Sequence, residues 1–187
     1  MAFELDLRWQ PLDEIGLEHC HVSETADGIA VRSALIGERD GLAFGAFYEI
    51  QLDPDWTFRS LTLRRHDGRV MRLVSNGEGD WKLDGRRAPE LEGCVDIDIS
   101  GTPFTNTLPM RRRRFEIDVP QRFDMAWLPL DTLEPLRDGQ IYTQLDATHF
   151  RYEAADRSLT EVLTIDENRF VIDYPSRFRR LTATDSL

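Results

Sequence analysis

The sequence has few of the features that mark membrane-spanning or secreted chains. It has no apolar run near the ~18 residues needed to cross a bilayer. Its N-terminus carries acidic residues where a secretory signal has Lys or Arg, and it lacks a continuous apolar segment there. We therefore expect a soluble chain that stays in the cytoplasm and is not an integral membrane protein.

Cysteine is also scarce, and the two that are present, Cys20 and Cys94, lie too far apart for a zinc motif. In a reducing compartment they are expected to be free, buried thiols. His19 and His21 share one face of a predicted strand, but no third metal ligand is evident, so we interpret them as half-exposed structural residues. Walker, Rossmann and GxSxG motifs are missing. The sequence thus indicates no metal and no cofactor.

Basic residues are fewer than acidic ones: 23 against 34, which leaves a formal net charge of -11. Such a chain repels a phosphate backbone unless its basic groups gather on one face. Lys82 is the single lysine, and we interpret the bias toward arginine as mostly genomic base composition. Nucleic acid is therefore not an expected partner.

Helical periodicity is rare, whereas alternation of apolar and polar residues runs through most of the 187 residues. In residues 44–52, for example, Ala46, Tyr48 and Ile50 share one face of an extended segment. HDG at 66–68 predicts a hairpin. Strands are also expected over 17–22, 28–37, 57–65, 69–75, a short piece at Trp81, 94–100, 111–119, 140–153 in two pieces, 159–165 and 169–173.

Helix is expected only over 102–109 and 175–181, and residues 120–135 are interpreted as an irregular crossover. This many strands in one unit must curl, close or stack. The sequence therefore predicts a mainly β fold: a single domain over 1–187, whose strongly curved antiparallel sheet forms an open half-barrel or a sandwich with few short helices. The concave face of such a sheet is a natural pocket.

The most distinctive segment is 91–114, LEGCVDIDISGTPFTNTLPMRRRR. Asp96 and Asp98 point to the same face of its predicted strand, about 7 Å apart. Two carboxylates can serve as general acid and base, bind a cation, or accept hydrogen bonds. Because both project in parallel from one strand and no His is nearby, we favour hydrogen bonding to the following Thr and Asn side chains or pairing with the arginines.

TPFTNTLP at 102–109 offers Thr105 and Asn106 in a short polar stretch bounded by prolines. In the strand predicted to follow, Arg111 and Arg113 share one face. A solvated or salt-bridged strand is the ordinary interpretation of such a run. The alternative is an inward pair that holds a phosphate or sulfate head group.

Several aromatic residues are candidates for contact with a ligand, and Trp81 and Tyr142 are the preferred ones. Either ring can stack on a sugar or line a lipid cavity. Packing in the core is the equally weighted alternative.

Segments distributed along nearly the whole chain resemble a bacterial glycolipid-binding family that was formerly a domain of unknown function. The longest is LEGCVDIDISGTPFTNTLPMRR at 91–112, which is more specific than a lone glycine-rich loop. The resemblance implies a curved antiparallel sheet similar to lipoprotein-carrier folds, with a hydrophobic cavity for acyl chains. The other matching segments are RWQPLDEIGLEHC at 8–20, DPDW at 53–56, WKLDG at 81–85, QIYTQL at 140–145 and DYPSRFRR at 173–180.

The first functional hypothesis is a noncatalytic protein that binds a glycolipid or another amphipathic small molecule on the concave face. A hydrolase for a glycoside or ester, with Asp96 or Asp98 as acid or base, is the second, and a scaffold in which TPFTNTLP locks two strands together is the third. The sequence leaves the oligomeric state open. The predicted ligand-binding residues are Trp81, Asp96, Asp98, Thr105, Asn106, Arg111, Arg113 and Tyr142.

Overall fold

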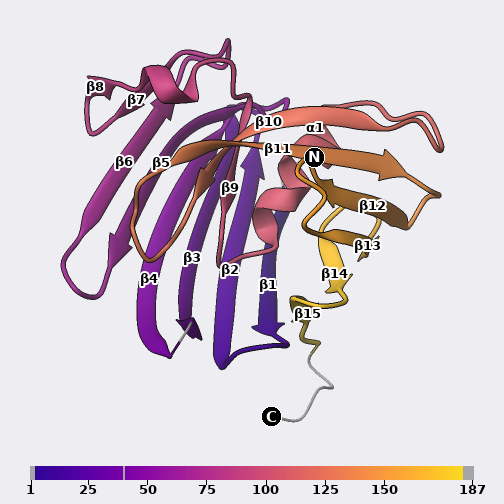
Figure 1. The fold of residues 1–187 in the computed structure, drawn as a ribbon, viewed down its shortest axis with the longest axis horizontal. Coiled ribbons are helices and arrows are strands. Elements are labelled where there is room, and N and C mark those ends of the chain that lie inside the picture. The colour runs from indigo at the N-terminus through magenta and orange to yellow at the C-terminus, as the bar shows by residue number, and fades with distance from the viewer. Residues whose placement is uncertain (1–2, 40, 183–187) are drawn as a thin grey trace.

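A single sheet of 15 strands accounts for most of the computed structural model, which describes residues 3–39 and 41–182 (Figure 1). Three short helical segments are η1 (Pro89–Leu91), η2 (Phe104–Asn106) and α1 (Thr107–Arg112). The strands are β1 (Phe3–Pro11), β2 (Gly16–Thr25), β3 (Gly28–Arg39), β4 (Leu42–Leu52), β5 (Phe58–Arg65), β6 (Val70–Ser75), β7 (Trp81–Leu83), β8 (Arg86–Arg87), β9 (Asp96–Ile99), β10 (Gln121–Leu128), β11 (Leu136–Gln144), β12 (His149–Ala154), β13 (Thr160–Ile165), β14 (Val171–Tyr174) and β15 (Phe178–Arg180).

The sheet consists of two antiparallel meanders, β1 to β8 and β10 to β15, which join where β1 pairs with β15. β9 adds to β10 in parallel and is the one parallel neighbour in the described sheet. The edge strands are β8 and β9, so the described sheet is curved but open. This architecture confirms the predicted fold class.

Alternation explains which face of the sheet is buried. In β4 the side chains of Tyr48 and Ile50 are fully buried, whereas Phe47, which precedes Tyr48, is 41% exposed on the other face. The hairpin predicted around HDG is confirmed as β5 and β6, and Cys20 and Cys94 are free and buried, as expected. Inward-facing apolar residues from both meanders supply the two clusters that form the core.

The strand predicted over 111–119 is wrong. Arg111 and Arg112 end α1, and residues 113–120 are not in a strand. Arg111 and Arg113 therefore do not share a strand face. A run of four arginines has no alternation to enforce an extended strand, and Pro109 lies in the first helical turn, where its missing N–H costs nothing.

Two further expectations are corrected. Residues 120–135 contain the regular strand β10, and 175–181 contain β15 rather than a helix. β15 has only three residues and pairs with the adjacent β14 and with β1, so its conformation depends in part on a strand that lies far away in sequence. β1 itself, at the start of the chain, was also not anticipated.

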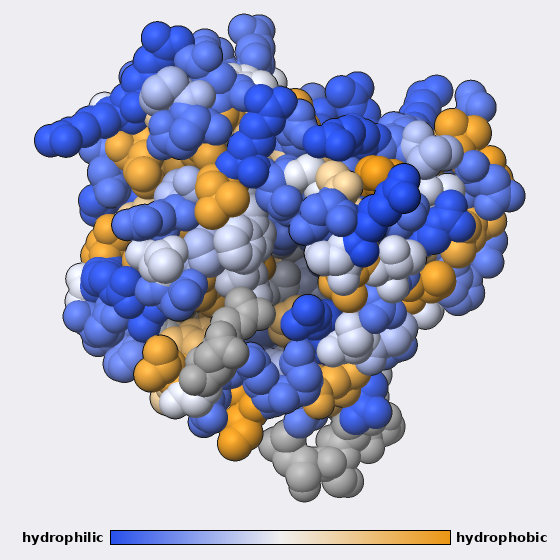
Figure 2. Space-filling model, in the orientation of Figure 1, coloured by the Kyte–Doolittle hydropathy of each residue, from blue (hydrophilic) through white to orange (hydrophobic). Residues whose placement is uncertain are grey.

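The segment that carries TPFTNTLP lies inside the curve of the sheet rather than on a surface loop (Figure 1). All residues from Thr102 to Met110 are buried, with Phe104 and Leu108 fully enclosed in the core. This segment therefore fills much of the concave face that the sequence predicts to be a pocket. On the face shown in Figure 2, hydrophilic residues predominate and the surface is hollowed near its centre.

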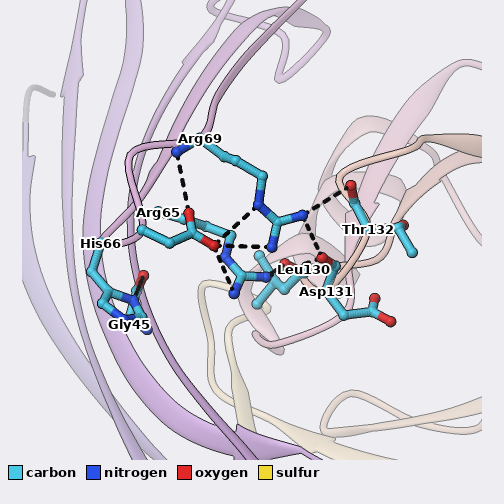
Figure 3. Close-up of polar contacts among 8 residues, drawn as sticks. Gly45, Arg65, His66, Arg69, Leu130, Asp131 and Thr132 are labelled. Atoms are coloured by element: carbon cyan, nitrogen blue, oxygen red, sulfur yellow. Dashed lines mark hydrogen bonds and ion pairs between the residues drawn. The ribbon is translucent and has the colours of Figure 1, made fainter.

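The connection between β10 and β11 reaches across to the β5–β6 hairpin (Figure 3). The Arg65 guanidinium donates to the carbonyl oxygens of Leu130 and Asp131, and Arg69 also donates to Asp131, at 2.8 Å. The Asp67 carboxylate forms ion pairs with both arginines, with N–O distances of 3.2 Å to Arg65 and 3.0 Å to Arg69. These contacts tie the second meander to the first and fix the position of Leu130.

Within residues 3–39 and 41–182, we find no helix with the length and apolar character required to span a bilayer.

Candidate ligand-binding cleft

A closed circuit of hydrogen bonds connects the buried TPFTNTLP segment to the inner face of the sheet. The Thr105 hydroxyl donates to Oδ1 of Asp98 at 2.9 Å, and Nε2 of Gln140 donates to Oδ2 at 2.6 Å. The Tyr142 hydroxyl donates to Oε1 of Gln140 at 3.0 Å and accepts from Nδ2 of Asn106 at 2.8 Å. Because Thr105 and Asn106 are consecutive, the circuit closes and fixes the orientation of Asp98.

The environment of Asp98 shifts its proton affinity. Burial raises the pKa of the Asp98 carboxyl, whereas the hydrogen bonds from Thr105 and Gln140 act to lower it, and the charge of Asp138 raises it further. The net direction is upward. Burial likewise raises the pKa of Asp138, two strands away on the same inner face.

Asp96 has a different environment from Asp98. It is fully buried, and its partner is Arg112, which donates from Nη2 at 2.8 Å and from Nε at 3.2 and 3.3 Å. Burial raises the pKa of Asp96 even though Arg112 acts to lower it. The predicted pairing with an arginine is thus present, but through Arg112 rather than Arg111 or Arg113.

A cleft of about 510 Å³ opens beside this circuit. Its charged lining consists of three carboxylates and one guanidinium. Four aromatic rings also line it. Trp127 is half-buried and lies directly beside Asp98 in the parallel β9–β10 pairing. The lining groups named are Asp98, Asp138, Asp156, Arg177, Trp127, Tyr152, Tyr174 and Phe178.

A narrow slot adjoins the cleft and shares Ser100, Arg177 and Phe178 with it. The slot has a volume of about 30 Å³, which is room for one or two water-sized groups. Its walls are mainly apolar, and one buried acidic residue, Glu18, contributes to them. The apolar wall includes Trp9, Leu17, Leu35, Phe44 and Leu130.

The structure separates the eight predicted ligand-binding residues. Asp98 and Asn106 line the cleft, and Thr105 and Tyr142 belong to the circuit behind it. Trp81 lies elsewhere in the core, stacked on Phe58 with ring centroids 5.1 Å apart. Of the eight, therefore, two are at the cleft and two support it.

The two predicted arginines are also outside the cleft. Arg111 lies over the Trp56 ring, 4.0 Å from its centroid, and donates from Nη1 to the carbonyl oxygen of Asn168 at 2.8 Å. Burial lowers the pKa of Arg111. Arg113 is exposed. Neither contributes to the cleft lining.

Sequence reasoning missed the cleft residues Asp138, Tyr174 and Arg177 as well as Glu18 in the slot. Asp138 lies in RDG, which was interpreted as a turn, and Arg177 in a segment interpreted as helix. Glu18 did carry a signal, because period-two alternation places it on the same face as the apolar residue Cys20. An acidic residue on a buried strand face is uncommon and marks a position for closer study.

His19 and His21 both approach Asp6, with N–O distances of 3.8 and 2.9 Å, on the outer face of the sheet. In the described part of the chain, no group of three or more His, Cys, Asp or Glu side chains is arranged to hold a metal ion.

The family model described as "Putative glycolipid-binding" matches residues 6–180. The chain belongs to this family. A crystal structure of a DUF1089 family protein from Pseudomonas aeruginosa is 35% identical, with a TM-score of 0.78, and the similarity covers 88% of this chain and 92% of that chain. Among curated proteins, none matches. These findings confirm the resemblance that the sequence indicated.

The family match includes the whole of the cleft. Its lining begins at Asp98 and ends at Phe178, so every contributing residue lies within the matched range 6–180. The cleft therefore lies wholly within the region that matches the family.

Proposed function

We propose that this chain binds a neutral, glycolipid-like amphipathic molecule, with the polar head in the cleft and the apolar tail directed into the slot. The observation that carries this proposal is the direct junction of a cleft lined by carboxylates and aromatic rings with an apolar slot. The description of the family supports a binding role.

The chemistry of the cleft suits a sugar. Carboxylate oxygens accept hydrogen bonds from hydroxyl groups, and an aromatic face offers apolar surface for the C–H groups of a sugar ring. Asp98, Asp138 and Trp127 together supply both kinds of contact. Three carboxylates against the single guanidinium of Arg177 disfavour an anionic head, so a neutral sugar fits better than a phosphate or sulfate.

The small volume of the slot limits how the apolar tail can enter it. At about 30 Å³ it is too small for an alkyl chain unless side chains move. Phe178 is half-buried at the junction with the cleft, and we propose that its ring swings aside to admit the tail. Each methylene that then leaves water contributes about 0.8 kcal/mol, which offsets the cost of that movement.

The proposal is tested by calorimetry with alkyl glucosides of increasing chain length, each below its critical micelle concentration. We expect affinity to rise by up to about fourfold per methylene. An alkyl sulfate of equal chain length is expected to bind more weakly. If none of the alkyl glucosides binds, the proposed function is wrong.

Two variants locate the head group. Asp138→Asn is expected to weaken alkyl glucoside binding about tenfold, because one acceptor for sugar hydroxyls is lost. Asp27→Asn, at the exposed β2–β3 turn, is the matched control and should leave affinity unchanged. Equal affinities for both variants would remove the head group from this cleft.

A glycoside hydrolase is the second candidate, because the cleft brings together Asp98 and Asp138, each with a pKa raised by burial. Asp96, which the sequence suggested as the partner of Asp98, instead faces Arg112. Incubation with a nitrophenyl glycoside tests this alternative. Turnover that Asp98→Asn abolishes would favour the enzyme, whereas binding without release of nitrophenol would favour the carrier.

A further inference from the structure

Glu18 is a buried carboxylate with one hydrogen-bonded oxygen and one that is not. Its side chain comes from β2, and the residue is 3% exposed. Oε1 accepts from the hydroxyls of Ser33 at 2.6 Å and Tyr48 at 2.7 Å. Oε2 is buried and has no hydrogen-bond partner among the described residues.

The strand pairing explains why Oε2 lacks a partner. Glu18 lies opposite Trp9 in β1 and Leu35 in β3, and both neighbours are apolar and buried. Thr102 supplies the next hydroxyl of this region and acts to lower the pKa of Glu18, but its hydrogen bonds join it to the backbone N–H of Phe104 at 3.0 Å and to the Tyr48 hydroxyl at 3.5 Å, and none reaches Oε2. A buried carboxylate oxygen without a hydrogen-bond partner in such surroundings is destabilising unless something pairs with it.

Glu18 is also one of the residues that line the slot. Trp9, Leu35 and Leu130 form apolar walls around it, and the volume of about 30 Å³ suits a group as small as a hydroxyl. An acceptor without a partner at the side of an apolar channel selects for ligands that carry a hydrogen-bond donor at the matching depth.

We propose that the slot recognises a hydroxyl group on the apolar tail of the ligand, and that Oε2 of Glu18 pairs with it. This inference rests on the proposed function and adds the chemistry of the tail. A hydroxyl both donates and accepts, so it pairs with Oε2 whether Glu18 is ionised or protonated. An ammonium group lacks an acceptor and would also lose its hydration inside the apolar walls.

The charges around the slot exclude a further class of ligand. Asp13, Glu14 and Glu38 also line it, and Arg177, the one cation of the lining, pairs with Asp13 at 3.3 Å. The surplus of carboxylates disfavours a tail that ends in a free carboxylate, as in an unesterified fatty acid. A hydroxylated, uncharged chain avoids that repulsion.

The test compares pairs of alkyl glucosides that are identical except for one hydroxyl on the tail, placed at successive carbons. At one position the hydroxylated compound is expected to bind the unaltered protein about tenfold more tightly than its plain counterpart. If plain and hydroxylated compounds bind equally at every position, the tail-hydroxyl inference is overturned while the proposed function stands. If neither compound binds, the proposed function itself fails.

Variants at position 18 test whether Glu18 causes the preference for a hydroxylated tail. Glu18→Gln should keep the hydroxyl preference, because the amide still pairs with a hydroxyl, whereas Glu18→Met should lose it with the plain compound still bound. Glu49→Met, on the outer face of β4, is the matched control. A hydroxyl preference that persists unchanged in Glu18→Met would overturn the assignment. Should that variant not fold, a structure of the unaltered protein with the hydroxylated compound decides, because the hydroxyl must lie within hydrogen-bond distance of Oε2.

Discussion

Arg112, the last residue of α1, extends its guanidinium to the fully buried carboxylate of Asp96, and three hydrogen bonds join the two side chains. The pair attaches the buried helix to β9, the parallel edge strand. It also leaves only 13% of the Arg112 side chain exposed, while Arg113 beside it is exposed. The arginine run is therefore divided between a structural contact and the surface.

Replacing Arg112 by Ala should lower the free energy of unfolding by about 3 to 5 kcal/mol, because Asp96 would then be buried without a counter-charge. Urea denaturation measures the loss. Arg113→Ala is the adjacent control, with an expected change within about 0.5 kcal/mol. Similar losses for the two variants would contradict the structural assignment.

Trp81 is expected to stabilise the fold without contacting the ligand. Its Nε1 donates to the carbonyl oxygen of Cys94 at 3.0 Å, and its ring stacks on Phe58. Trp81→Phe should cost about 2 to 4 kcal/mol, because it leaves a buried carbonyl unpaired and a small cavity. Affinity for an alkyl glucoside, measured under native conditions, should not change. If the folded Trp81→Phe variant bound the alkyl glucoside more weakly than the unaltered protein, Trp81 would be a ligand contact, as the sequence suggested.

The hydrogen bond from Gln140 should tune the proton affinity of Asp98. A donor to a carboxylate favours its charged form, so Gln140→Met is expected to raise the pKa of Asp98 further above its ordinary value. Carbon NMR of the Asp98 carboxyl measures the titration. Gln144→Met, in the same strand, is the control, because the Gln144 side chain donates to a backbone carbonyl instead. An unchanged or lowered Asp98 pKa in Gln140→Met would show that the circuit does not act on this carboxyl.

Glu18 should make stability depend on pH in a defined direction. Burial raises the pKa of the Glu18 carboxyl from 4.5, although the hydroxyls of Ser33, Thr102 and Tyr48 act to lower it. The folded state therefore binds this proton more tightly than the unfolded state. The associated stability is fully present below pH 4.5 and is lost as pH rises through the folded-state pKa.

The Glu18→Gln variant has no carboxyl to titrate at this position, so it cannot lose that stability. As pH rises from 4.5, the free energy of unfolding of the unaltered protein should therefore fall relative to that of the variant. Urea denaturation at a series of pH values measures it. Glu49→Gln controls for loss of a half-exposed carboxylate on the outer face. A difference that stays constant, or that reverses sign, over this range would argue against a buried, proton-binding Glu18.

Local pattern was enough to predict much of the sheet. Alternation around Tyr48 and Ile50 identifies β4 and its buried face, and the Asp-Gly turn identifies the β5–β6 hairpin. Both features depend on residues within a few positions of one another. The segment 91–112 likewise identified the family, because its motif is long and unusual.

The cleft and slot depend on contacts that no local pattern encodes. Asp98, Asp138 and Arg177 come from β9, β11 and the β14–β15 turn, and Glu18 from β2. They meet because the second meander returns to pair with β1 and because Arg65 ties the β10–β11 connection to the first meander. The sequence by itself determined many of the strands, among them β3, β4 and the β5–β6 hairpin, and the family. Only the tertiary structure decided that TPFTNTLP is buried and which carboxylates face the cleft, because long-range strand pairing and packing select the inner face and its neighbours.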